Sequence, residues 1–187
     1  YIVNYDYPED DPRHYEGEYR GIKYNKADQD LYKEYAFLTQ GKTHATIGNL
    51  NNHIGVPLTL LSIPITAQMA VIEMGANHLH EIESYCSYTL PTHGLITNCG
   101  KAHLEGFGSL EGVKKGKGEL FDFLRAHNGT AFVMNDYDYL HTLSKGIQNI
   151  ITYGTSNEAS IVGDVADHSS FLHVSFKKGI TGSIATQ

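Results

Sequence analysis

Cysteine, long apolar runs and positive charge are all scarce in this chain of 187 residues. The two cysteines, Cys86 and Cys99, show no CxxC spacing and fit a reducing cytoplasm better than a disulfide framework. No apolar run reaches the roughly 18 residues that a membrane-spanning helix needs. The formal net charge of −7 argues against a nucleic acid held by phosphate neutralisation. We therefore expect a cytoplasmic protein with no membrane span and no nucleic-acid partner.

The composition is that of a folded domain. Hydrophobic residues make up 41% and charged residues 19% of the sequence, which is enough to bury a core. The beginning differs, because "YDYPEDDPRHYEGEYRG" is rich in tyrosine, acidic residues and proline and has no steady period. We expect residues 1–41 to be an irregular segment, with at most a short helix over 28–38, and residues 42–187 to form the main domain.

From Thr43 onward, short apolar runs alternate with helical stretches. The runs predict buried strands at Met69–Glu73, Gly94–Asn98, Thr130–Met134 and Asn149–Tyr153. The stretches between them predict helices at Val56–Leu61, Leu79–Tyr88, Ser109–His127 and Tyr137–Ser144. This order is typical of an α/β fold, a mostly parallel sheet flanked by helices. The alternating tail "SFLHVSFKKGITGSIATQ", which turns at Lys178-Gly179, predicts an antiparallel strand pair near the C-terminus.

Polar residues end two of the predicted strands. Glu73 ends "MAVIE", and Asn98 ends "GLITN". In open parallel sheets, ligands bind just beyond the carboxyl ends of the strands. The two residues therefore suggest a site, although solvation of a strand end explains either of them equally well.

A lysine lies on the apolar side of the predicted helix 109–127. The apolar residues of one buried stripe are Leu110, Val113, Leu120, Phe121 and Leu124. Lys117 is four residues from Val113 and from Phe121, so it projects from that stripe, where a bare ammonium is costly unless paired. It either extends to solvent or to a nearby acid, or meets the strand-end carboxylate and a ligand. Gly116 and Gly118, which are poor helix formers, suggest the close approach of another backbone or of a ligand.

Several motifs together resemble one known family. "GNLNNHIGVPLTLL", "VIEMGANH", "ITNCGKAHLEGFGSLEGV" and "KGELF" occur here in the order and at close to the spacing found in the Mur ligases. The resemblance covers about Lys42 to Gln187. It implies the central domain of these enzymes, a P-loop NTPase-like α/β domain. The "YGTSNEASIVGD" segment resembles the end of that domain in the branch that uses D-alanyl-D-alanine.

The resemblance implies a reaction and its ligands. That branch uses ATP to phosphorylate the terminal carboxylate of UDP-N-acetylmuramoyl-tripeptide, and the amine of D-alanyl-D-alanine attacks the resulting acyl phosphate. The product is an amide bond in a peptidoglycan precursor. ATP and Mg²⁺ are the implied cofactors, and the two peptides are the implied substrates. The implied macromolecular partners are the remaining domains of the same ligase.

The resemblance also assigns residues. Glu73 and His103, the histidine of "AHLE", match metal ligands of the family, and Lys117 matches a lysine that is typically carbamylated and can then support a metal ion. Asn98 is expected to shape the same site. The loop before the first predicted helix resembles a segment that contacts the UDP-muramyl peptide, through Asn49, Asn51 and Asn52. Asparagine is also common in turns that bind no ligand.

The match to the family is incomplete at the phosphate-binding loop. "LTQGKTHAT" contains Gly41-Lys42-Thr43 but lacks the preceding glycine and asparagine of such a loop and the long helix that should follow. Lys42 and Thr43 bind phosphate only if this is a degenerate loop. The favoured interpretation is a strand over 42–46 that leads into the asparagine-rich loop.

The ends also depart from the family pattern. We expect residues 1–41 to be a remnant of the UDP-binding domain and of the phosphate-loop helix, and residues 42–187 to be an incomplete central domain. One alternative function is a non-catalytic module that binds muramyl peptide and metal but has lost nucleotide turnover. Another is a metal-dependent phosphohydrolase, for which Asn135-Asp136 gives weak support.

Overall fold

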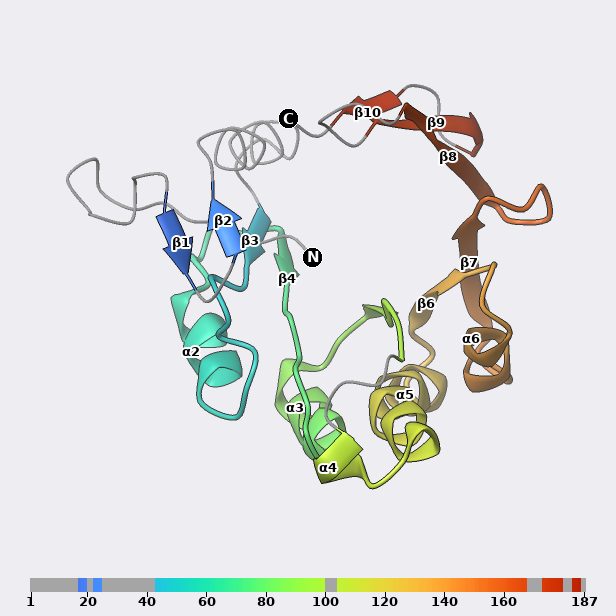
Figure 1. The fold of residues 1–187 in the computed structure, drawn as a ribbon. Helices are drawn as coiled ribbons and strands as arrows, with labels where there is room; N and C mark the ends of the chain where they lie inside the picture. The colour runs from blue at the N-terminus through green and yellow to red at the C-terminus, as the bar shows by residue number, and fades with distance from the viewer. Residues whose placement is uncertain are drawn as a thin grey trace. The chain divides into compact units, whose positions relative to one another are not determined.

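The protein was analysed as a computed structural model that describes residues 17–19, 22–24, 43–99, 104–167, 173–179 and 183–185 (Figure 1). Side chains are described over 43–99, 106–164 and 175–179. The chain divides into two compact units between Met74 and Gly75. The first unit contains β1 to β4 and α2, and the second contains the remaining elements.

The first unit holds two small sheets. Strands β1 (Gly17–Tyr19) and β2 (Ile22–Tyr24) pair antiparallel, with Gly17 opposite Tyr24. The irregular segment expected over 1–41 therefore includes a short strand pair, because Tyr and Ile favour strands even where no longer period is visible. The helix expected within 28–38 lies outside the described residues.

The second sheet of this unit confirms the favoured interpretation of the sequence around Thr43. Strand β3 (Thr43–Ala45) pairs in parallel with β4 (Met69–Val71), and Thr43 lies opposite Met69. Helix α2 (Gly55–Ser62) connects them, with Pro57 in its first turn. Proline suits this position because the N–H that it lacks would have no acceptor within the first turn of a helix.

The second unit is built on a six-stranded sheet. Its order is β10-β9-β8-β7-β6-β5, and its strands are β5 (His93–Leu95), β6 (Thr130–Met134), β7 (Asn149–Gly154), β8 (Ile161–Asp167), β9 (His173–Lys178) and β10 (Ser183–Ala185). Strands β5 to β8 run parallel, whereas β9 is antiparallel to both β8 and β10. The predicted α/β fold, with a mostly parallel sheet and an antiparallel pair near the C-terminus, is confirmed.

The helices of this unit are α3 (Glu81–Thr89), α4 (Leu104–Phe107), α5 (Leu110–Ala126) and α6 (Asp138–Leu143). Helices α3 and α4 both pack against α5 (Figure 1). Three of these helices follow the predicted pattern closely. Helix α4 was not predicted, because a helix of 4 residues is too short to show a period.

One core joins α5 to the parallel strands. Phe121 and Leu124 of α5 are fully buried, as are Ala131 and Val133 on one face of β6. The alternation along β6 is that of a strand with one face packed on helices. The predicted stripe on α5 is therefore its core face. None of the helices in the described part of the chain is long and apolar enough to cross a membrane.

Candidate functional site

The first unit fixes Glu73 from two sides. The sequence predicts that Glu73 ends its strand. Strand β4 instead ends at Val71, so Glu73 lies two residues beyond it. Its main-chain N–H donates to the Thr46 hydroxyl at 2.8 Å, and its carboxylate accepts the side-chain amide of Asn51, also at 2.8 Å. Thr46 is fully buried, whereas Glu73 and Asn51 are half-buried. These contacts orient an oxygen-rich group just past the carboxyl end of β4.

The three asparagines of the loop before α2 have different environments. The side-chain oxygen of Asn52 accepts the N–H groups of Ile54 and Gly55 at 3.0 and 2.9 Å, which is a turn that starts the helix. Asn51 binds Glu73, and Asn49 is exposed. The structure therefore gives Asn52 a local structural role, while substrate binding by these three residues stays a prediction.

The second unit holds the predicted lysine beside the end of β5. Lys117 is half-buried on α5, and its Nζ donates to the main-chain oxygen of Asn98 at 2.6 Å. Asn98 lies three residues beyond Leu95, where β5 ends, so it too follows its strand rather than ending it. Lys117 thus contacts the main chain of Asn98, while its expected meeting with the Glu73 carboxylate stays a prediction. Among the described residues, no acidic side chain pairs with Lys117.

The hydroxyl of Tyr139 holds the residue that follows Asn98. The main-chain N–H of Cys99 donates to Tyr139 Oη at 3.1 Å. Burial raises the pKa of the Tyr139 phenol, although the N–H of Cys99 opposes this shift. The phenol therefore keeps its proton at neutral pH. Sequence reasoning missed Tyr139, because nothing in its spacing shows that α6 brings it to the end of β5.

The glycines around Lys117 serve packing. A methyl group at Gly116 would lie 2.3 Å from the ring of Phe107, and one at Gly118 would lie 3.1 Å from the side chain of Leu143. The close approach expected at these glycines therefore occurs, but its partners are core side chains. The sequence could not identify them, because Phe107 reaches Gly116 only through the turn between α4 and α5.

Glu119 is a buried acid that sequence reasoning also missed. It lies on α5 with 8% of its surface exposed. Its two oxygens accept the main-chain N–H groups of His80 at 2.6 Å and Glu83 at 3.0 Å, at the start of α3. A negative charge is favourable at the N-terminus of a helix. The signal that could have found it is an acid directly before the apolar Leu120-Phe121 pair in "KGELF".

Asp136 follows β6 and is also held by main-chain groups. Its carboxylate accepts the N–H and hydroxyl of Thr155 at 2.8 and 3.0 Å and the N–H of Ser156 at 3.3 Å. The N–H of Thr155 contributes most to lowering the pKa of Asp136, and burial opposes this shift. Asp136 thus joins the loops after β6 and β7. These hydrogen bonds explain why an acidic residue follows β6, and they do not require a metal ion.

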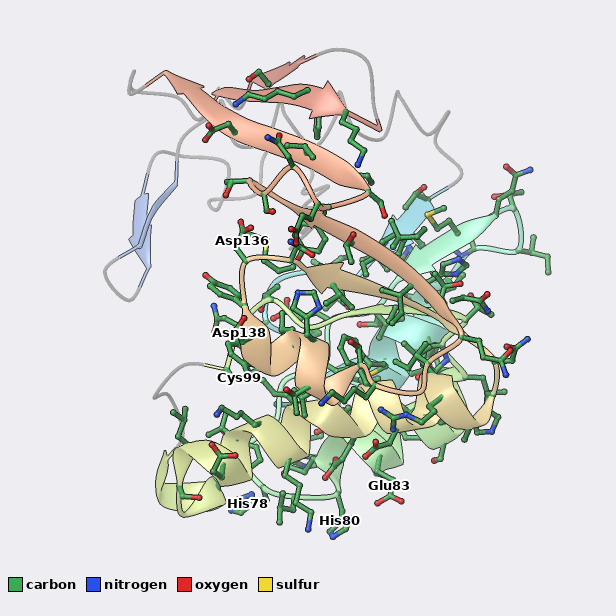
Figure 2. All side chains as sticks on the ribbon, turned by 90° about the vertical axis from the view of Figure 1, so that its right-hand side faces the viewer. His78, His80, Glu83, Cys99, Asp136 and Asp138 are labelled. Atoms are coloured by element: carbon green, nitrogen blue, oxygen red, sulfur yellow. The ribbon has the colours of Figure 1, made fainter. Side chains whose placement is uncertain are left out.

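The described cysteines and histidines form no metal centre of their own. Cys86 and Cys99 are free and buried, and burial, aided by the charge of Glu119, raises the pKa of Cys86 to about 12. His78 and His80 each pair with a nearby glutamate on the surface. Figure 2 shows His78, His80 and Glu83 well apart from Asp136 and Asp138. No three His, Cys, Asp or Glu side chains of the described residues could hold a metal ion together.

The predicted site residues fall in different parts of the chain. Glu73 belongs to the first unit, and Asn98 and Lys117 belong to the second. Glu73 and Asn98 each lie just past the end of a parallel strand, and Lys117 reaches Asn98 from α5. His103 and Lys42 lie outside the described residues. Thr43 is a strand residue of β3, which favours the strand interpretation of "KTHAT" over a degenerate phosphate loop.

The donor chemistry at Glu73 fits magnesium. Mg²⁺ prefers hard oxygen ligands, keeps several waters and binds through one or two carboxylates together with substrate phosphates. Glu73 presents a half-buried carboxylate with Asn51 bound to one of its oxygens, Oε1. A carboxylate held in this way can supply one ligand of such a site, so the lack of a three-residue cluster among the described side chains is compatible with it.

Comparison with known proteins identifies the family. The model of the Mur ligase middle domain matches residues 30–186. The UDP-N-acetylmuramoyl-tripeptide–D-alanyl-D-alanine ligase of Escherichia coli (strain K12) is 53% identical over 102 residues, which are 54% of this chain and 22% of that protein. The ligase of the same name from Bacillus subtilis (strain 168) is 33% identical over 139 residues, 74% of this chain and 30% of that protein. The chain thus spans less than a third of the length of these relatives.

Solved structures agree with the sequence match. A crystal structure of MurF from Acinetobacter baumannii has a TM-score of 0.68 and 27% sequence identity, and covers 80% of this chain and 33% of that one. MurF from Thermotoga maritima in complex with ADP also has a TM-score of 0.68, with 24% identity over 81% of this chain and 35% of that one. The second likeness concerns the fold alone. By the family match over most of its length, this chain belongs to the Mur ligase middle-domain family.

Proposed function

We propose that this chain provides the ATP-dependent middle domain of a ligase that joins D-alanyl-D-alanine to UDP-N-acetylmuramoyl-tripeptide. Relatives of that name support it, as does membership of the Mur ligase middle-domain family. The product is a precursor of peptidoglycan, so the activity serves cell-wall synthesis. Because its substrates ATP and the UDP-peptide are cytoplasmic, we expect the reaction to take place in the cytoplasm. Residues 42–187 act together with further domains of the same ligase.

The observation that carries the proposal is the contact of Lys117 with the oxygen of Asn98 at 2.6 Å, beyond the carboxyl end of β5. A lysine there, with no acid paired to it among the described residues, is free to react through its amine. Its neutral amine can attack the carbon of CO₂, forming an N–C bond and releasing one proton to solvent. The product is a carbamate with one negative charge. The nitrogen keeps one N–H, which can still donate to Asn98.

The remaining residues bind and orient. Glu73, His103 and the carbamate of Lys117 are proposed to hold magnesium, and Asn51 keeps the Glu73 carboxylate in one orientation. Bound there, Mg²⁺ would offset the negative charge of the phosphate groups. The terminal carboxylate of the tripeptide takes the γ-phosphoryl group of ATP, and ADP leaves. The amine of D-alanyl-D-alanine then forms the amide bond, and phosphate and a proton leave. Asn49, Asn51 and Asn52 are proposed to contact the UDP-peptide.

Replacement of Lys117 by alanine tests this proposal in the full ligase. We expect Lys117→Ala to lower the ligation rate by about 100-fold or more, because the magnesium that offsets the developing charge then lacks one of its proposed ligands. Short carboxylic acids such as formate should restore part of the rate by replacing the carbamate. Lys115→Ala, at an exposed position of the same helix, is the matched control and should keep full activity. Full activity of Lys117→Ala would contradict the proposal.

Phosphate release separates the ligase from a binding module. The ligase should release phosphate from ATP only when both peptide substrates are present. Calorimetry on the same protein should show that the UDP-peptide binds. Binding of the UDP-peptide without any phosphate release would favour the non-catalytic module instead.

A further inference from the structure

The peptide group between Asn98 and Cys99 is held at both of its polar atoms. Its oxygen, on Asn98, accepts Lys117 Nζ at 2.6 Å, and its N–H, on Cys99, donates to Tyr139 Oη at 3.1 Å. One donor comes from α5 and the acceptor comes from α6. A planar peptide group cannot turn its oxygen without turning its N–H. The direction of the oxygen that binds Lys117 therefore depends on the tyrosine hydroxyl.

We infer that Tyr139 is a positioning residue for Lys117, acting through the Asn98–Cys99 peptide group. Its hydroxyl fixes that peptide group, and the peptide oxygen fixes Lys117 Nζ. The inference rests on the proposed function, in which Lys117 takes up CO₂. It adds a residue on α6 to the machinery that prepares the lysine.

The surroundings of Tyr139 assign this role to the hydroxyl and not to the ring. The ring stacks on Tyr137, with 5.5 Å between ring centres and 16° between planes. Lys114 Nζ lies 5.8 Å from its centre on α5. These contacts hold the ring whether or not the hydroxyl is present. Removal of the oxygen alone therefore leaves the packing intact and takes away the acceptor of the Cys99 N–H.

Burial makes that acceptor important. Cys99 has 8% of its surface exposed, so water does not readily replace a lost acceptor for its N–H. Without the hydroxyl, the peptide group is more stable when its N–H turns toward another acceptor. The oxygen turns with it and no longer faces Lys117 Nζ. The N–H that the carbamate of Lys117 keeps then lacks this acceptor, so the carbamate is less stable relative to the free amine and needs more CO₂ to form.

Tyr139→Phe is the test, made in the full ligase, with Tyr137→Phe as the matched control. Both changes remove one hydroxyl from the same stacked pair, but only Tyr139 accepts the Cys99 N–H. In Tyr139→Phe we expect amide exchange at Cys99 to speed up by about threefold to tenfold, the usual worth of one hydrogen bond. Protein labelled with ¹⁵N-cysteine reports this, with Cys86 inside α3 as the internal reference.

Two further measurements connect the hydroxyl to Lys117. The ¹³C NMR signal of the lysine carbamate, formed from ¹³C-bicarbonate, should need about threefold to tenfold more bicarbonate to reach half of its maximum in Tyr139→Phe. The ligation rate should show the same shift, with the KM values of the two peptides unchanged. Saturating bicarbonate should restore the rate, which a purely structural defect would not allow.

The outcomes separate this inference from the proposed function. If Tyr139→Phe matches Tyr137→Phe in both Cys99 exchange and bicarbonate dependence, the positioning role is wrong, whatever Lys117→Ala does. If Cys99 exchange speeds up but bicarbonate dependence stays that of the wild type, the role is also wrong. If no carbamate signal forms even in the wild type and Lys117→Ala is active, the proposed role of Lys117 is wrong, and the positioning role of Tyr139 is wrong with it.

Discussion

The hydroxyl of Thr46 accepts the main-chain N–H of Glu73 at 2.8 Å, so the residue that follows β3 sets the path of the chain that follows β4. The N–H of Thr46 donates in turn to the oxygen of Val71 at 3.0 Å. The two contacts extend the pairing of two short parallel strands up to the candidate metal ligand. These contacts fix the main chain at Glu73, and the side chain of Asn51 fixes its carboxylate.

We predict that Thr46→Val destabilises the protein by about 1–3 kcal/mol, since the N–H of Glu73 then lacks an acceptor next to a buried side chain. Valine has nearly the shape of threonine, so packing changes little. Urea unfolding measures the free energy. In the full ligase, the same change should raise the magnesium concentration needed for half-maximal activity, because Glu73 loses its fixed position.

Thr46→Ser is the control for this prediction. Serine keeps the hydroxyl but removes one buried methyl group, so its free energy of unfolding should fall by about 0.5–1.5 kcal/mol, whereas its magnesium requirement should stay close to that of the wild type. If valine and serine raise the magnesium requirement alike, the hydroxyl does not hold Glu73.

Much of the fold could be predicted because its signals are local. The apolar spacing of 109–127 identified α5 and its buried face, and the alternation after His173 identified the antiparallel pair of β9 and β10. The rule that ligands bind beyond parallel strands pointed to Glu73 and Asn98, each of which lies a few residues past its strand. These inferences need only the period of a segment and the order of segments.

The missing parts depend on contacts between distant segments. Tyr139 and Cys99 are 40 residues apart, and Glu119 and His80 are 39 residues apart. Gly112 is a case at shorter range: a methyl group there would lie 2.1 Å from the main-chain oxygen of Phe107 in the preceding helix, which explains a glycine in the first turn of α5. No period in the sequence records such pairings, so they become visible only in the folded chain.

We predict that Glu119→Gln lowers the free energy of unfolding by about 1–3 kcal/mol. The carboxylate of Glu119 accepts two N–H groups at the start of α3, whereas a glutamine has one oxygen and would present its NH₂ group to one of them. The change also removes a negative charge that the helix N-terminus favours. Urea unfolding of the variant measures the loss.

Asp122→Asn provides the comparison on the same helix. Asp122 is exposed and pairs with Arg125 on the surface, so its replacement should cost less than about 0.5 kcal/mol. An equal effect of the two changes would show that α5 tolerates the loss of either acid and that Glu119 does not hold α3.

The link between Asp136 and Thr155 predicts how stability changes with acid. The N–H of Thr155 is the largest cause that lowers the pKa of Asp136 below its ordinary value of 3.8. The folded state thus binds this proton less readily than the unfolded state. The stabilisation is fully present above pH 3.8 and is lost as the pH falls below it, through the lowered pKa of the folded state. Because Asp136 is exposed, the effect should stay below about 1 kcal/mol.

Unfolding in urea at a series of pH values measures this effect as the difference between wild type and Asp136→Asn. Asparagine keeps one acceptor oxygen for the loop after β7 but cannot carry the charge, so the difference should be largest near neutral pH and should shrink as the solution is acidified. Asp138→Asn removes a charge two residues away, from a carboxylate that accepts no hydrogen bond in the described part of the structure, and should leave the pH dependence of the wild type nearly unchanged. A difference for Asp136→Asn that stays constant from neutral pH down to pH values well under 3.8 would mean that the bond to Thr155 does not depend on the charge of the carboxylate.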